Sequence, residues 1–296
     1  MQKIHARKAL TANGWESDVC LEIENGQISQ ISDDATQGGQ IVDLLLPAPT
    51  NLHSHAFQRA MAGLTETRGP DPKDSFWTWR QLMYRFLDRL TPDHVQTIAE
   101  LVYMEMLEAG YGAVAEFHYL HHDISGTPYA NLPEMAERIT EAAKSTGIGL
   151  TLLPVLYMQG GCDGRALQGG QQRFGCDFDL FAELYSASAN IIAEGPADFH
   201  IGIAPHSLRA VTPEALAHIR EISPTGPIHM HLAEQVAEVD EVQAHLGARP
   251  TEWFLQNADV SKDWCLIHCT QMTNAETQNL AATGAVAGLC PITESS

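Results

Sequence analysis

Two histidines separated by a single residue constrain this chain more than any other feature. They lie in NLHSHAFQRAMAG, residues 51–63, which follows an apolar run at residues 41–46. We interpret the run and the histidines as one buried strand, in which alternate side chains share a face, so His53 and His55 are expected to point to the same side. Neutral imidazole is the commonest protein ligand for zinc. The pair therefore predicts half of a metal site.

Three later segments place polar side chains where an apolar run ends. GIAPHSLRAVTPE, residues 202–214, carries His206 and Arg209. PIHMHLAEQ, residues 227–235, has His231 at the end of its run and Glu234 three residues further on, while WCLIHCT, residues 264–270, has His268. In a parallel α/β barrel the catalytic groups gather at this edge of the strands. These residues are therefore expected to share one site with the histidine pair.

The chain is strongly acidic. Its 37 acidic and 17 basic residues give a net charge of −20, which argues against nucleic-acid and anionic-membrane partners because both require a basic surface. The N-terminal sequence MQKIHARKAL lacks the apolar core of a signal peptide, and no stretch is apolar enough to cross a bilayer. We therefore expect a cytoplasmic protein.

The six cysteines form no C-x-x-C pair. Cys265 and Cys269 flank His268, but strand alternation turns Cys265 away from the histidine's side. Buried free thiols are therefore favoured over a zinc-thiolate role.

The order of predicted elements changes near residue 44. Residues 1–45 read as short strands with a hairpin at Asn25-Gly26, which indicates a small N-terminal β domain. From residue 44 onward seven strands alternate with helices, which indicates parallel β/α units in a second domain spanning residues 46–296. Helix starts are marked by Thr91 and by a capping box of Thr273 and Glu276. After the first, the predicted strands cover residues 113–117, 148–156, 199–204, 228–232, 264–268 and 285–289.

Seven strands are one short of a (β/α)8 TIM barrel, and we expect the chain to stop before the eighth. An open doubly wound sheet is the competing α/β architecture. The barrel is favoured because functional residues follow almost every strand, whereas an open sheet concentrates them at one switch point. The Gly- and Gln-rich residues 160–175 predict a long mobile loop, a candidate lid.

Taken together, the motifs resemble the amidohydrolase superfamily and, within it, the subfamily of formimidoylglutamate deiminases. The H-x-H pair and HMHLAEQ belong to many deaminases of the superfamily. The resemblance to the subfamily is carried by SFWTWRQLMYR at residues 75–85, EFHYLHH at 116–122, APHSLRAV at 204–211 and CPITE at 290–294. It spans essentially the whole chain and implies a barrel of the metal-dependent amidohydrolase type.

The resemblance also implies the cofactor. One zinc ion would be held by His53, His55 and His231, together with an aspartate from the eighth strand. Because the chain has no such strand or aspartate, we expect a truncated product that is inactive by itself. The full-length protein is expected to be a homodimer.

By the same resemblance, the reaction is hydrolytic deimination of N-formimino-L-glutamate to N-formyl-L-glutamate and ammonia in histidine degradation. Bound zinc lowers the pKa of a water molecule to about 7, so that hydroxide is available to attack the formimino carbon. Glu234 would deliver a proton to the imino nitrogen. His268 would orient the water and stabilise the tetrahedral intermediate.

The dicarboxylate substrate requires cationic groups at its two acid ends. The resemblance assigns these to Arg80 and Arg209, and guanidinium suits the task because its planar fork matches a carboxylate bidentately. Gln58, Tyr119 and His206 would supply further hydrogen bonds.

Two other functions stay open. A ring aminohydrolase acting on guanine, adenosine-type or triazine substrates would share the metal site but has no use for two carboxylate-binding arginines. A non-catalytic pseudoenzyme would have no reason to keep Glu234 and His268 beside an inert site.

A second histidine cluster follows residue 117. We interpret His118, His121 and His122 as the lining of a polar loop rather than a second metal site. His229, two residues before His231, is interpreted as a packed histidine deeper in the barrel.

Overall fold

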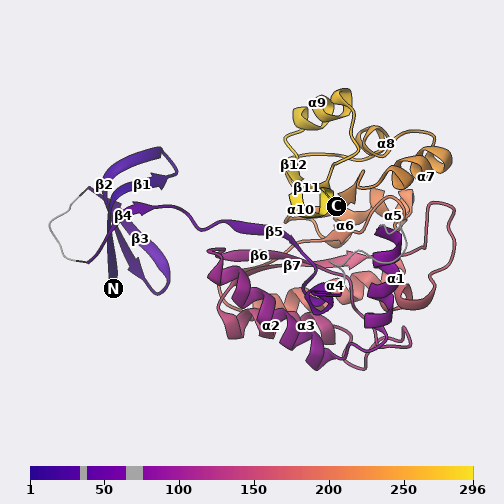
Figure 1. Ribbon diagram of the computed structural model, residues 1–296, viewed down its shortest axis with the longest axis horizontal. Helices are drawn as coiled ribbons and strands as arrows, with labels where there is room; N and C mark the ends of the chain where they lie inside the picture. The colour runs from indigo at the N-terminus through magenta and orange to yellow at the C-terminus, as the bar shows by residue number, and fades with distance from the viewer. Residues whose placement is uncertain (34–38, 65–75, 296) are drawn as a thin grey trace. The chain divides into compact units, whose positions relative to one another are not determined.

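The computed structural model describes residues 1–33, 39–64 and 76–295. It divides into two compact units, Met1–Pro49 and Thr50–Ser296 (Figure 1). The first unit is a four-stranded sheet with the order β3-β2-β1-β4. Asn25 and Gly26 both have positive φ, 51° and 78°, as a two-residue hairpin turn requires, so the predicted hairpin is confirmed. The strands are β1 (Gln2–Thr11), β2 (Gly14–Glu24), β3 (Gln27–Ser32) and β4 (Gln40–Leu45).

The strand that precedes the histidine pair differs from the prediction. Residues 41–45 belong to β4, which pairs in parallel with β1 in the first unit, and Ile41 is 67% exposed rather than buried. His53 lies in a separate strand, β5 (Thr50–Ser54). Pro47 and Pro49 explain the break, because proline has no N–H to donate to a strand ladder.

The second unit contains parallel strands whose neighbours follow the chain order. One sheet runs β5-β6-β7-β8 with β9 paired to β7, and another runs β10-β11-β12. A parallel bridge between Ile203 and Ile228 connects the two. This order has no reversal at which a doubly wound sheet would switch direction, so the α/β barrel-type fold is confirmed. The remaining strands are β6 (Ala113–His118), β7 (Gly149–Leu156), β8 (Phe199–Ile201), β9 (Ala204–Pro205), β10 (Ile228–Leu232), β11 (Trp264–His268) and β12 (Val286–Gly288).

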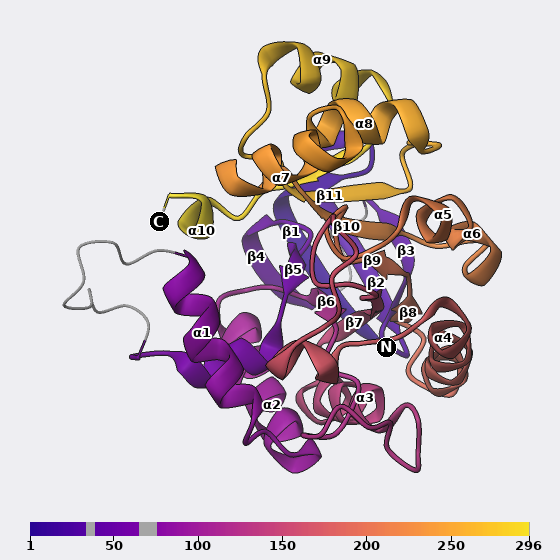
Figure 2. The ribbon, with the colours of Figure 1, turned by 90° about the vertical axis from the view of Figure 1, so that its right-hand side faces the viewer.

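Helices surround these strands (Figure 2). Apolar residues of the strands, such as Leu152 and Met230, are fully buried, as expected for parallel strands covered on both faces. Thr91 caps α2, and Thr273 with Glu276 forms the predicted capping box of α9. The helices are α1 (Phe76–Leu87), α2 (Pro92–Glu108), α3 (Glu134–Thr146), α4 (Phe178–Ala193), α5 (Pro213–Ala217), α6 (Ile219–Ile222), α7 (Val236–Leu246), α8 (Pro250–Asn257), α9 (Asn274–Ala282) and α10 (Pro291–Glu294), with the 3-10 helices η1 (Ala56–Met61) and η2 (Gly169–Arg173).

Two strands of the second unit, β5 and β12, have a single strand partner each in the described part of the chain. Within the described residues, β5 pairs with β6 alone and β12 pairs with β11 alone. None of the helices in the described ranges is long and apolar enough to span a membrane.

The loop at residues 160–175 is packed at its C-terminal end, where the sequence predicted mobility. Arg173 is 1% exposed, and its guanidinium donates to the carbonyl oxygens of His122, Leu87 and Leu90. Its own carbonyl accepts from the backbone N–H groups of His121 and His122 at 3.0 Å. A buried guanidinium must keep its acceptors, so this part of the loop is held in place.

This packing predicts a large effect of Arg173→Met on folding. The substitution leaves three carbonyl groups without their charged donor, and loss of such a buried interaction typically costs about 3 kcal/mol or more. Urea denaturation should therefore give a clearly lower free energy of unfolding.

The matched control is Arg165→Met in the same loop. The Arg165 side chain is 49% exposed and pairs with Asp163 and Glu241, an arrangement that typically contributes about 1 kcal/mol or less. If both variants lose the same free energy of unfolding, the claim that Arg173 holds the C-terminal end of the loop is wrong.

Candidate functional site

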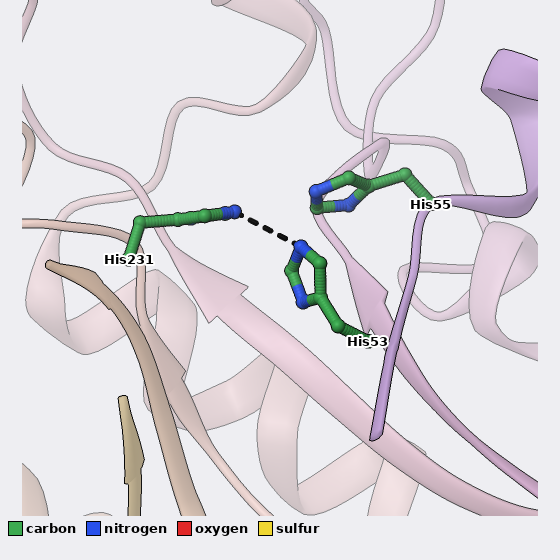
Figure 3. A group of neighbouring side chains, drawn as sticks. All are labelled: His53, His55 and His231. Atoms are coloured by element: carbon green, nitrogen blue, oxygen red, sulfur yellow. Dashed lines mark hydrogen bonds between the residues drawn. The ribbon is translucent and has the colours of Figure 1, made fainter. Parts of the chain in front are cut away.

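Three imidazole rings converge at the carboxyl ends of β5 and β10. His53 lies near the end of β5, His55 directly follows it, and His231 lies in β10. The Nε2 atoms of His53 and His231 are 3.1 Å apart, and the rings of His53 and His55 have centroids 4.5 Å apart. One ring nitrogen from each of the three lies within 4.8 Å of the others. Figure 3 shows the three rings turned toward one another.

Backbone carbonyls orient two of these rings. Nδ1 of His55 lies 3.0 Å from the carbonyl oxygen of Phe117, and Nδ1 of His231 lies 3.2 Å from that of His206. When Nδ1 donates to a carbonyl, the lone pair of Nε2 is left for a ligand, which is the arrangement usual for metal-binding histidines.

Burial keeps the three rings neutral. It lowers the pKa of His55 to about 4, and it lowers the pKa of His231 and His53 well below 6.5, with neighbouring imidazoles adding to the effect. Neutral imidazole is the form that coordinates a metal. Three neutral, converging nitrogens therefore fit a zinc ion in donor type and in orientation.

Glu234 and His268 lie beside the three rings. Glu234 follows β10 and His268 ends β11; both are buried, and Oε1 of Glu234 lies 3.8 Å from Nε2 of His268. The rings of His231 and His268 stack with centroids 5.4 Å apart. Ala233 and His268 have positive φ values of 51° and 74°, and such strain in residues with side chains is concentrated at functional sites.

The residues predicted to bind substrate line the same region. The ring of Tyr119 lies 4.9 Å from that of His55, and its hydroxyl accepts a hydrogen bond from Gln58 at 2.8 Å. The rings of His206 and His231 are also 4.9 Å apart. Arg80 donates to the hydroxyl of a tyrosine at position 157, at 3.4 Å.

The second predicted arginine is partly buried in the same region. Nε of Arg209 is inaccessible and has no hydrogen-bond partner among the described residues. Burial is unfavourable for this charge, but the carboxylate of Glu238 and the other acidic groups nearby more than offset it, so the pKa of Arg209 is raised. A buried cation with an unused donor can bind an anion.

Several residues of this region were missed in the sequence. The hydroxyl of Tyr84 is buried, and burial raises its pKa to about 12 despite the opposing effect of the nearby Arg80. Tyr157 also accepts from the side chain of Gln171 at 3.1 Å. Aromatic residues at these positions resemble ordinary core residues in the sequence, so no pattern distinguished them.

Glu116 begins the EFHYLHH motif, but the sequence assigned it no role. It is 1% exposed, and its carboxylate accepts from the backbone N–H of Ala56 at 2.7 Å and from Tyr103 at 3.1 Å. Burial raises its pKa to about 7. Glu116 therefore holds the chain immediately after His55.

A second group of possible ligands includes His268. Atoms of His268, Cys290 and Glu294 lie within 4.8 Å of one another, and Oε1 of Glu294 is 3.6 Å from Nδ1 of His268. No spacing pattern in the sequence predicted this group. Cys265 and Cys269 are buried free thiols, and burial raises their pKa to about 11 and about 12.

The cluster after residue 117 does not converge on one point. Nε2 of His121 lies 2.9 Å from the carbonyl oxygen of Val155, and Nε2 of His122 lies 2.8 Å from that of Gly175. His118 is 4% exposed, and burial lowers its pKa to about 3. These are neutral, packed histidines.

His118 predicts a pH dependence of stability. The unfolded chain takes up a proton on this residue near pH 6.5, whereas the folded protein does so near pH 3. The contribution of neutral His118 to the free energy of unfolding is therefore complete above pH 6.5 and is lost as the pH falls toward 3. Over this window the free energy of unfolding changes by up to about 1.4 kcal/mol per pH unit. His118→Leu should flatten the dependence of the unfolding free energy on pH in that window.

The control for this measurement is His200→Leu, because His200 is exposed. Denaturation curves are recorded at several pH values. The unfolding free energy of the control should depend on pH as steeply as that of the unchanged protein. If His118→Leu and the unchanged protein show the same slope, the neutral buried state of His118 is wrong.

Two sequence-family models match this chain. Residues 44–296 match the model of the amidohydrolase family, and residues 1–40 match the N-terminal domain of formimidoylglutamate deiminase HutF. The chain is similar to the formimidoylglutamate deiminase of Pseudomonas aeruginosa, with 47% identity over 99% of this chain and 65% of that protein. It is 24% identical to the 8-oxoguanine deaminase of the same organism, over 95% of this chain and 62% of that protein.

Comparisons with solved structures give the same fold. The amidohydrolase from Brucella melitensis matches with a TM-score of 0.95 and 48% identity, over 100% of this chain and 66% of that one. An atrazine chlorohydrolase from Arthrobacter aurescens, complexed with zinc and atraton, matches with a TM-score of 0.74 and 18% identity, over 96% and 64% of the two chains. The chain thus spans about two thirds of the length of these proteins.

Proposed function

The chain belongs to the amidohydrolase family, and from this premise we propose that it catalyses the hydrolysis of N-formimino-L-glutamate to N-formyl-L-glutamate and ammonia, a step of histidine degradation. The observation that carries the proposal is the placement of three converging imidazoles beside two arginines. The 47% identity to a formimidoylglutamate deiminase and the match of residues 1–40 to the N-terminal domain of that enzyme support it.

In this proposal His53, His55 and His231 hold one zinc ion. Bound zinc supplies a Lewis acid and a water molecule whose pKa is about 7. The neutral state of the three imidazoles supports the assignment, as do the backbone carbonyls that orient the rings of His55 and His231. A neighbour of the same fold, the atrazine chlorohydrolase, is also complexed with zinc.

Glu234 and His268 carry the proton transfers. Glu234 takes a proton from the attacking water and delivers it to the imino nitrogen, which gives an amino group on a tetrahedral carbon. Transfer of the remaining hydroxyl proton to that amino group breaks the C–N bond, so that ammonia leaves and the formyl C=O forms. His268 accepts a hydrogen bond from the attacking water or donates to the oxygen that develops negative charge, and so orients the attack. The 3.8 Å separation of the two side chains allows both to reach the same substrate carbon and its substituents.

The substrate's two carboxylates are held by Arg80 and Arg209. Gln58, Tyr119 and His206 supply the remaining hydrogen bonds of the pocket. The buried and unpartnered Nε of Arg209 supports this assignment, because a carboxylate would use a donor that no described residue satisfies. The homodimeric state and the cytoplasmic location expected from the sequence are part of the same proposal.

The metal assignment predicts which substitutions abolish zinc binding. His53→Ala and His231→Ala each remove one of three nitrogen ligands, so zinc affinity should fall at least about 100-fold. Competition with a chromophoric chelator measures the affinity, and elemental analysis measures the zinc content. His245→Ala, an exposed residue, is the control and should retain zinc. Retention of zinc by both ligand variants would contradict the assignment.

The pocket predicts the substrate class. Loss of one charged partner from a desolvated carboxylate typically costs about 2–5 kcal/mol, so Arg209→Met should lower kcat/KM for formiminoglutamate about 30-fold or more. Arg80→Met should also lower it. Ammonia release measures the rate in the chain extended to the length of its relatives, and zinc content should be unchanged in both variants.

The same variants test the alternative function. The 24% identity to an 8-oxoguanine deaminase is the reason to test it. Guanine and adenosine are therefore assayed in parallel. Purine deamination that survives both arginine substitutions would replace the dicarboxylate proposal with a ring aminohydrolase.

A further inference from the structure

A buried carboxylate that the proposed reaction does not use lies behind Glu234. Glu238 occupies the first turn of α7 and is 2% exposed. Its Oε1 accepts from the backbone N–H of Ala233 at 3.2 Å, and its Oε2 accepts from the backbone N–H of Glu234 at 2.9 Å. Both oxygens of one buried side chain thus bind the short connection between β10 and α7.

This connection has an unfavourable backbone conformation. Ala233 has a φ of 51°, in the left-handed region that residues with a Cβ rarely adopt. The turn is nevertheless the element that directs Glu234 toward His268, 3.8 Å away. Two hydrogen bonds to the oxygens of one buried carboxyl group offset the cost of such a turn. Glu238 therefore determines where the chain places Glu234.

Arg209 of the proposed substrate pocket interacts electrostatically with Glu238. Burial raises the pKa of Glu238, and the positive charge of Arg209 opposes this shift. Arg209 in turn is stabilised by Glu238 more than by any other charge. One buried carboxylate thus interacts with both the proposed substrate-binding arginine and the proposed proton donor.

We propose that Glu238 is a positioning residue, which holds the turn at residues 233–234 so that Glu234 is correctly placed for proton transfer. It lies behind the turn and acts through Glu234. The effect on catalysis rests on the proposed function, whereas the hold on the turn can be measured without it.

Glu238→Gln tests the proposal. The amide has the volume of the carboxylate, but it offers an NH2 group to one of the two backbone donors, so one hydrogen bond is lost. We expect kcat for formiminoglutamate to fall about tenfold or more, with KM within about twofold and zinc content unchanged. Amide hydrogen exchange at Ala233 and Glu234 should accelerate by a similar factor.

A double-mutant cycle separates positioning from a general structural role. If Glu238 acts through Glu234, the substitution Glu238→Gln should lower kcat little further when Glu234→Gln is already present. A structural residue would lower kcat by the same factor in both backgrounds. Equal factors, or unchanged hydrogen exchange at residues 233–234, would overturn the proposal.

Two controls complete the design. Asp240→Asn removes an acidic charge from the exposed side of the same helix and should leave kcat and hydrogen exchange unchanged. If Glu238→Gln does not fold, Ala233→Gly is added to every variant, because glycine adopts positive φ without strain. Activity is measured on the chain extended to the length of its relatives. If that protein does not hydrolyse formiminoglutamate, the proposed function fails, and faster exchange at residues 233–234 in Glu238→Gln still supports the hold on the turn.

Discussion

The convergence of three uncharged imidazoles at the carboxyl ends of parallel strands is the arrangement on which the rest of the site depends. Parallel strands bring residues from distant parts of the chain to one edge, and here that edge unites His53 and His55 with His231, 178 residues away from His53. Burial keeps the rings neutral, so their lone pairs are available. Backbone carbonyls then turn two of the rings inward.

Around these rings the chain accepts several locally unfavourable features. Ala233, His268 and Cys269 have positive φ, and the carboxylates of Glu116 and Glu238 are buried. Glu116 accepts from the backbone N–H of Ala56, next to the proposed ligand His55, and Glu238 accepts from the backbone N–H of the proposed proton donor Glu234. Strain and buried charge of this kind reduce stability, and such features persist where they hold functional groups in position. The surrounding packed strands supply the stability that this arrangement requires.

Much of this architecture could be predicted from the sequence because it follows local patterns. Strands β10 and β11 match the predicted ranges because apolar runs mark their limits, and α2 and α9 begin where the capping residues predict. The first barrel strand was misplaced because two prolines divide a continuous apolar stretch. The loop at residues 160–175 was misjudged because the acceptors of Arg173 lie as far as 86 residues away in the sequence. Glu238 was missed because its partners are backbone groups, which leave no trace in the side-chain pattern.

The most direct test of the central claim is X-ray absorption at the zinc edge of the metal-loaded protein. Coordination by His53, His55 and His231 predicts imidazole nitrogens at about 2.0–2.1 Å with the multiple scattering of their rings. A sulfur ligand at about 2.3 Å would instead place the metal at the neighbouring group of His268, Cys290 and Glu294. That result would contradict the three-histidine site.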